Sequence, residues 1–129
     1  MRTTQVIRLM VVHDHAGVRN GLATYFGHEP GMEVVSATTC GDEVLDMVAE
    51  LHPDMVLMQR SWGGIEAARR LTEAHPETRV AVVSASADAQ CRAEAAHSGA
   101  VGVLDLAAPP SETAMALRLL MRVTGATPA

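Results

Sequence analysis

The chain contains no lysine. All ten of its basic residues are arginines, set against fifteen acidic residues, and the formal net charge is −5 over 129 residues. Any mechanism that needs a lysine ammonium group is therefore excluded. The acidic balance also argues against a domain that grips nucleic acid by itself, because phosphate binding requires a basic face. Aromatic residues are equally scarce: Tyr25, Phe26 and Trp62 are too few for a base-stacking platform.

Cysteines and long apolar runs are scarce as well. Cys40 and Cys91 lie far apart and form no Cys-x-x-Cys pair, which favours free thiols in a cytoplasmic protein. Every apolar run falls short of the ~20 residues that a membrane helix needs, so we expect no membrane contact. We also identify no signal-peptide cleavage site. A hydrophobic content of 48% excludes a disordered chain, and the length is that of one domain.

Short apolar runs alternate with stretches of helical spacing. The runs cover residues 7–12, 32–37, 55–58, 80–83 and 101–104, and they are typical of strands buried on both faces of a parallel sheet. Helix faces recur at positions 18, 22, 25 and 26, at 44, 45, 48 and 51, and over 65–74, 89–97 and 113–123. This order predicts an α/β fold, a flavodoxin-like (βα)5 doubly wound parallel sheet with strand order 2-1-3-4-5.

Ligands of such sheets bind at the carboxyl ends of the strands, near the switch between strands 1 and 3. The rule directs attention to His13, Asp14 and His15 after the first strand and to residues 59–62 after the third. It also directs attention to residues 84–86 after the fourth strand and to 105–106 after the fifth.

Several segments, in order and spacing, carry a family resemblance. They read IRLMVVHDHAGVRNGLATYF, HPDMVLM, GGIEAARRL, HPETRVAVVSA, HSGAVGVL and APPSE. With these the chain resembles the receiver domain of bacterial response regulators, in the subfamily whose receiver precedes a LuxR/NarL-type helix-turn-helix. The resemblance implies a receiver-like domain over residues 1–124. Residues 125–129 are small and breaker-rich, and we interpret them as the start of a linker to a missing C-terminal DNA-binding domain.

The resemblance also implies a chemistry, phosphoryl transfer to an aspartate with Mg²⁺ held by acidic residues. The chain departs from that pattern at nearly every position. His13-Asp14 replaces the acidic pair, Gln59 replaces the phospho-acceptor, and Leu106 replaces the lysine. Val103 takes the place of the switch aromatic residue, and the loop after the third strand is about three residues short. Only Asp14 and Ser84 match, which predicts a pseudo-receiver.

Three features of this edge leave alternatives open. Arg60 is either a partner of Asp14 across the pocket or a solvated loop residue. His13, Asp14 and His15 suggest a metal site, but the shortage of further ligands favours a polar strand end. There, His13 and Asp14 would bond each other or Ser84, so we expect no metal and no other cofactor. Trp62 either lines the pocket or packs on neighbouring helices, and we favour the packed ring.

The last predicted helix has more apolar surface than one buried stripe requires. We interpret Met115, Leu119, Leu120 and Arg122 as the face of a homodimer. The alternative is a face covered by the missing downstream domain.

Together these features predict a non-enzymatic regulatory domain of a DNA-binding transcriptional regulator, controlled without aspartyl phosphorylation. Control would come from dimerisation, a small-molecule effector or a partner protein. One alternative is a residual phospho-signalling domain that takes its phosphoryl group on His13 or a serine. Another is a stand-alone binding module or metal sensor built on His13, Asp14 and His15.

Overall fold

A computed structural model of the chain describes residues 6–123. The predicted linker at 125–129 lies outside them, as do residues 1–5 and 124 of the predicted receiver-like domain. The elements run β1 (Ile7–Val12), α1 (Ala16–Gly27), β2 (Met32–Thr38), α2 (Glu43–Leu51), β3 (Met55–Gln59), α3 (Gly64–Ala74), β4 (Arg79–Ser84), α4 (Ala89–His97), β5 (Gly102–Asp105) and α5 (Pro110–Leu120).

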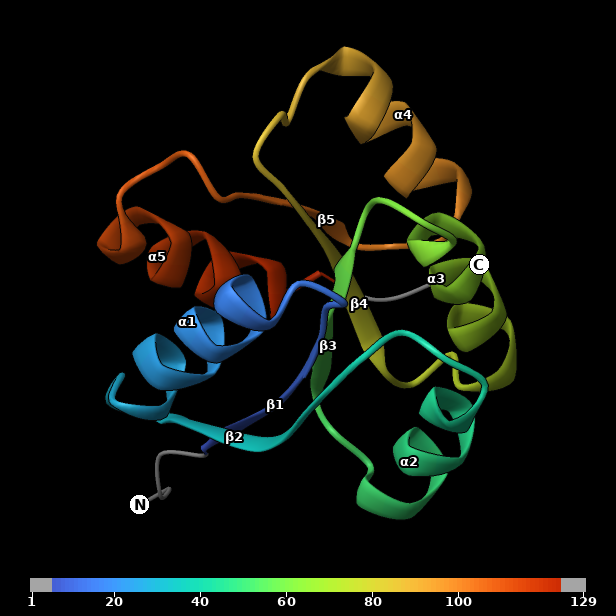
Figure 1. The fold of residues 1–129 in the computed structure, drawn as a ribbon, viewed down its shortest axis with the longest axis horizontal. Helices are drawn as coiled ribbons and strands as arrows, with labels where there is room; N and C mark the ends of the chain where they lie inside the picture. The colour runs from blue at the N-terminus through green and yellow to red at the C-terminus, as the bar shows by residue number, and fades with distance from the viewer. Residues whose placement is uncertain (1–5, 124–129) are drawn as a thin grey trace.

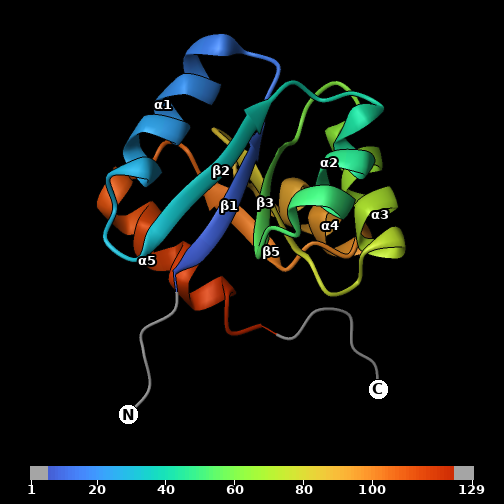
Figure 2. The same cartoon turned by 90° about the horizontal axis from the view of Figure 1, so that it is seen from below.

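The five strands form one parallel sheet in the order β2-β1-β3-β4-β5, which confirms the predicted fold class. Helices α1 and α5 cover one face, and α2, α3 and α4 cover the other (Figures 1 and 2). Within the described residues, no helix is long and apolar enough to cross a membrane.

The alternation of side chains along the strands builds two cores. In β1, Leu9 and Val11 pack toward α1 and α5, whereas Met10 and Val12 pack toward α2 and α3. All four are fully buried, and so is the whole of β3, the central strand. Because successive side chains point to opposite faces, a strand covered on both sides is apolar along nearly its whole length, as the short runs predict, and in β3 only the last residue, Gln59, is polar.

Strands β3, β4 and β5 each extend one residue beyond the predicted apolar run. Their last residues are Gln59, Ser84 and Asp105, and the backbone register pairs Gln59 with Val83 and Ser84 with Asp105. An apolar run in the sequence marks the buried positions of a strand, but the backbone pairing of the sheet continues one residue past the last apolar side chain. These extra residues bring polar groups to the carboxyl edge of the sheet.

Helix α5 corrects the predicted range of 113–123. It begins at Pro110, since proline at the first helical position gives up an N–H that has no partner there. It ends at Leu120, and Met121 closes the last turn by donating its N–H to the carbonyl of Leu117.

Candidate functional site

The carboxyl edge of the sheet borders a cavity of about 350 Å³ that is open to solvent. Of the predicted pocket residues, His13, Gln59, Arg60, Ser84 and Leu106 line it. Asp14 lies beside it and bonds to Gln59. The strand ends thus bring all six residues into one neighbourhood.

A reciprocal hydrogen-bond pair joins Gln59 to Asp14. The Asp14 backbone N–H donates to Gln59 Oε1 at 2.5 Å, and Gln59 Nε2 donates to Asp14 Oδ2 at 3.0 Å. The second Nε2 hydrogen goes to the carbonyl of Ser61 at 2.8 Å. Gln59 is only 2% exposed, so its amide is held between β1 and the loop that follows β3. We call these three hydrogen bonds the Gln59 lock.

Both oxygens of the Asp14 carboxylate have donors. Oδ2 accepts from Gln59, and Oδ1 accepts from the backbone N–H of Cys40 at 2.8 Å. These two hydrogen bonds lower the pKa of Asp14 below its ordinary value, because they stabilise the ionised form. The carboxylate is therefore charged and already bonded within the protein.

The loop after β3 turns sharply over the lock. Trp62 and Gly63 both have left-handed backbone conformations, with φ of 49° and 85°. A Cβ on Gly64 would lie 1.7 Å from the carbonyl oxygen of Gln59, so glycine is required there. Trp62 is 81% exposed at the rim of the cavity. The packed ring that we favoured for Trp62 is wrong, because the left-handed turn directs it away from the helices.

Arg60 does not pair with Asp14. Its Nε donates to Glu94 Oε1 of α4 at 3.0 Å, and both side chains are partly buried. The guanidinium therefore ties the β3–α3 loop to α4. Neither alternative for Arg60 holds, because the side chain is partly buried and pairs with a carboxylate on α4.

The two histidines also differ from the prediction. His13 Nδ1 accepts from the His15 backbone N–H at 3.1 Å, rather than bonding Asp14 or Ser84. The His15 ring caps α1 by accepting from the Val18 N–H. Burial, followed by the neighbouring His15, lowers the pKa of His13. In residues 6–123, no group of three or more His, Cys, Asp or Glu side chains is placed to hold a metal ion.

Ser84 and Leu106 complete the edge. The Ser84 hydroxyl oxygen accepts from the Ser86 N–H at 3.0 Å, and the serine is 8% exposed. Leu106 is partly buried against the α1/α5 core. Val103 packs with Val82, and with Cys91 of α4, on the opposite face.

The predicted dimer face is exposed only in part. Met115 and Leu119 of α5 are 63% and 60% exposed, and Arg122 is exposed just beyond the helix. Leu120 instead packs against the core, with its side chain 2.7 Å from where a Cβ on Gly102 would lie. Leu120 is therefore a core contact, and we correct its assignment to the face.

Sequence reasoning missed two members of the site. Cys40 contributes its backbone N–H, which any residue would supply, so its identity carries no signal. Burial, followed by the Asp14 carboxylate, raises the pKa of the Cys40 thiol, which keeps it protonated. Glu94 was missed because its partner Arg60 lies 34 positions earlier in the chain. Only the packing of α4 against the β3–α3 loop brings the two together.

Comparison with known proteins identifies the family. The model of the response regulator receiver domain matches residues 9–117. The chain belongs to the response regulator receiver family. It is 34% identical over 118 residues to the response regulator GacA of Pseudomonas viridiflava, covering 89% of this chain and 55% of that protein. The GacA of Pseudomonas aeruginosa is 33% identical over 116 residues, with 88% and 54% covered. The chain spans about half the length of the curated relatives it matches.

Solved structures agree with this membership. A LuxR-family two-component response regulator from Aurantimonas superposes with a TM-score of 0.81 at 26% identity, over 91% of this chain and 86% of that one. The response regulator domain of Thermotoga maritima CheB gives 0.79 at 30% identity, over 92% and 98%. This chain is the receiver domain of a two-component regulator, and its structural neighbours include LuxR-type proteins.

One relative is named as an enzyme. A protein-glutamate methylesterase/protein-glutamine glutaminase of Geobacter metallireducens is 36% identical over 88 residues, which cover 66% of this chain and 25% of that protein. Receiver domains are regulatory and not enzymatic. The matched residues cover 25% of that protein, and the similarity describes only this part of it.

Replacing Gln59 with alanine tests the energetics of the lock. We expect Gln59→Ala to lower the free energy of unfolding at pH 7 by about 1–3 kcal/mol, because it leaves buried hydrogen-bonding groups without partners. The pKa of Asp14 should rise toward its ordinary value of 3.8. Because the pKa of Asp14 is lower in the folded state than in the unfolded state, its carboxylate stabilises the fold above the unfolded-state pKa, and this stabilisation is lost as the pH falls through the folded-state pKa. The loss of stability caused by Gln59→Ala should therefore be smaller in acid.

Urea unfolding across pH and NMR titration of the Asp14 carboxyl group measure both effects. Gln90→Ala on the exposed face of α4 is the matched control, and it should change stability by no more than about 0.5 kcal/mol. An unchanged Asp14 pKa in Gln59→Ala would contradict the lock.

Proposed function

We propose that this receiver is the regulatory domain of a DNA-binding transcriptional regulator and works as a pseudo-receiver, without aspartyl phosphorylation. The observation that carries the proposal is the Gln59 lock. Gln59 stands at the end of β3, where the family resemblance places the phospho-acceptor, and its side-chain amide is buried and hydrogen-bonded at both ends. A carboxamide does not accept a phosphoryl group to form an acyl phosphate.

The cation that assists phosphoryl transfer would also lack its ligands. Mg²⁺ binds through carboxylate and phosphate oxygens and retained waters. Here the Gln59 amide donates to the Asp14 oxygen that faces it, so a protein N–H stands against the carboxylate. A neutral imidazole at His13 replaces the second acid. The residues of the edge therefore do not fit a magnesium centre.

The cationic contact to the phosphoryl group is missing as well. The resemblance places the family's lysine at Leu106, an apolar side chain packed on the core. The nearby Arg60 is engaged by Glu94. Developing phosphoryl charge requires positioned cations and donors, and the lysine position presents an alkyl side chain instead.

The DNA-binding assignment rests on the relatives. A LuxR family DNA-binding response regulator from Silicibacter pomeroyi superposes with a TM-score of 0.74 at 26% identity, over 90% of this chain and 92% of that one. The curated GacA relatives are nearly twice as long as the matched region. We infer that the DNA-binding function belongs to a C-terminal domain, since this domain is acidic.

Labelling with radioactive acetyl phosphate tests the loss of phosphorylation. We expect no label on the wild-type chain. We also expect none on Gln59→Asp, because the second acid and the lysine are still absent. The triple variant Gln59→Asp, His13→Asp and Leu106→Lys restores the second acid and the lysine. Comparing its labelling with that of Gln59→Asp alone isolates the contribution of those two groups. Label on the wild type at His13 or a serine would favour residual phospho-signalling instead. Label on Gln59→Asp alone would show that one residue separates this pocket from a working one.

We also propose that α5 forms a homodimer face. Met115 and Leu119 lie one helical turn apart and are both exposed, and exposed large apolar side chains at that spacing form a stripe. Arg118, on another side of the same helix, pairs with Glu29 of the segment after α1 and so fixes α5 against its own domain.

Charge insertion on this stripe tests the dimer. Leu119→Glu should convert a dimer into a monomer in sedimentation equilibrium, because it buries an unpaired carboxylate in an apolar contact. Ala49→Glu, exposed on α2 at the other side of the sheet, is the control and should leave the mass unchanged. A wild-type mass that is monomeric, or that Leu119→Glu does not alter, would contradict the proposal.

A further inference from the structure

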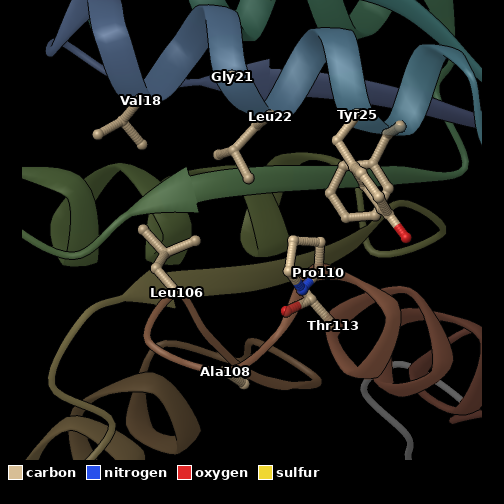
Figure 3. Close-up of a pocket in the computed structure, with 9 residues that line it drawn as sticks. Val18, Gly21, Leu22, Tyr25, Leu106, Ala108, Pro110 and Thr113 are labelled. Carbon is tan, nitrogen blue, oxygen red and sulfur yellow. The ribbon is translucent and has the colours of Figure 1, made fainter.

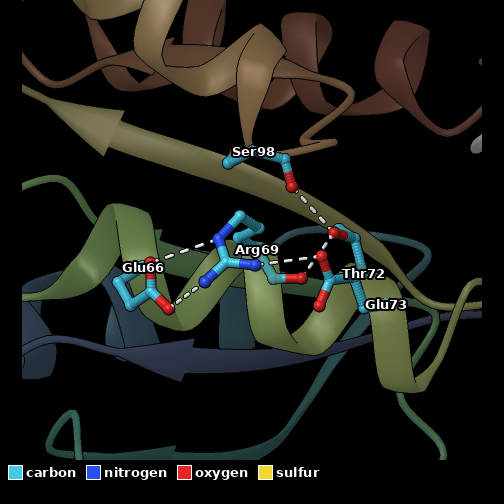
Figure 4. Close-up of polar contacts among 5 residues, drawn as sticks. All are labelled: Glu66, Arg69, Thr72, Glu73 and Ser98. Atoms are coloured by element: carbon cyan, nitrogen blue, oxygen red, sulfur yellow. Dashed lines mark hydrogen bonds and ion pairs between the residues drawn. The ribbon is translucent and has the colours of Figure 1, made fainter.

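A second cavity, of about 280 Å³, lies between α1 and the segment that leads from β5 into α5. Figure 3 shows Val18, Leu22 and Tyr25 of α1 facing Leu106 and Pro110 across it. None of the nine residues that line it carries a formal charge. We propose that this α1/α5 cavity binds a small neutral apolar molecule that carries one hydrogen-bond donor.

A helical glycine lines the cavity on the side that opens to solvent. Gly21 lies in the interior of α1, where glycine destabilises a helix relative to alanine. Steric need does not explain it, because a Cβ there would meet nothing within 4 Å. Gly21 lines the cavity, so the missing side chain is part of the hollow. Gly21 is exposed where the cavity opens to solvent between Val18 and Leu22, so a larger side chain at this position would extend over the opening.

The size of the cavity sets the size of the ligand. The cavity is open to solvent at the exposed residues Gly21 and Pro110. An enclosed apolar cavity of about 150 Å³ holds benzene, and the volume here is roughly twice as large, which suits a partly covered bicyclic aromatic compound of about ten to twelve non-hydrogen atoms. An ionised ligand does not fit, because the lining offers no opposite charge. Arg118, near Tyr25, is engaged by Glu29 and by the carbonyl of Pro30.

Thr113 supplies the polar contact. It is 6% exposed, and its Oγ1 lies 3.4 Å from two acceptors, the carbonyls of Asp105 and Pro109. Its single proton serves one of these at a time. In the part of the chain that the structure describes, the hydroxyl oxygen accepts no hydrogen bond, so its lone pairs can receive an O–H or N–H of the ligand.

The cavity also touches the β5–α5 segment and the edge of the sheet. Val18 and Leu106 line both this cavity and the one at the carboxyl edge. Leu106, at the place where the resemblance puts a lysine, therefore makes the shared wall apolar. A bound ligand would contact both α1 and the first turn of α5, where Pro110 and Thr113 lie. Binding itself does not depend on the proposed loss of phosphorylation.

Amide NMR titration of the labelled chain with 2-naphthol tests the inference. We expect saturable shifts centred on Gly21, Leu22, Ala108 and Thr113. The ionised 2-naphthoate should bind at least about tenfold more weakly, because the lining has no cation. Thr113→Val, which keeps the shape but removes the hydroxyl, should weaken 2-naphthol more than naphthalene.

Two glycine variants of α1 form the matched pair. Gly21→Leu should reduce 2-naphthol affinity by about tenfold or more by filling the cavity. Gly27→Leu, in the same helix and also free of neighbours within 4 Å, should leave the affinity unchanged. Ala108→Leu fills the cavity from the opposite wall and repeats the test should Gly21→Leu not fold.

Two kinds of outcome overturn the inference, and a third separates it from the proposed function. No saturable shift, or equal affinity in Gly21→Leu and Gly27→Leu, would show that the cavity does not bind the probe. A Gly21→Leu effect on sedimentation mass without an effect on 2-naphthol would mark the region as a contact between copies. Phosphoryl label on the wild type together with 2-naphthol binding would reject the proposed function and leave this inference standing.

Discussion

The hydrogen bonds between Gln59 and Asp14 are the constraint on which the carboxyl edge depends. They join the residues at the ends of β1 and β3, which are neighbours in the sheet, and a third hydrogen bond, to the carbonyl of Ser61, uses the second N–H of the Gln59 amide. Among the described residues, no buried side-chain nitrogen or oxygen lacks a partner, so the edge is satisfied without any ion. A neutral amide here supplies the donor that keeps Asp14 ionised, because its hydrogen bond favours the carboxylate.

The residues around the Gln59 lock hold the loop after β3 in place. Gly64 allows the chain to return within contact of the Gln59 carbonyl, and the left-handed turn at Trp62 and Gly63 places the loop over the amide. Arg60 leaves the pocket to pair with Glu94, which fixes the same loop to α4. The position after β5 holds Leu106, so no charged side chain stands where the resemblance places a lysine. The result is a rigid, internally bonded edge beside an apolar cavity.

The sheet could be predicted from the sequence because its determinant is local. Apolar runs mark strands buried on both faces, and their alternation with helices leaves few topologies. Placing Gln59, Ser84 and Leu106 at one edge followed from the same rule. The partner of Arg60 could not be predicted, because it depends on how α4 packs. Nor could the exposure of Trp62, which depends on a left-handed backbone, or the packing of Leu120 beside Gly102.

The most direct test of the account is an amide NMR titration of this domain with Mg²⁺ and then beryllofluoride, which mimics a phosphoryl group on an aspartate. The account predicts no saturable shift at Asp14, Gln59 or Ser84, because the lock occupies the carboxylate and no acceptor exists. Saturable shifts confined to these three residues would show that a working cation and phosphoryl pocket persists, and would contradict the account.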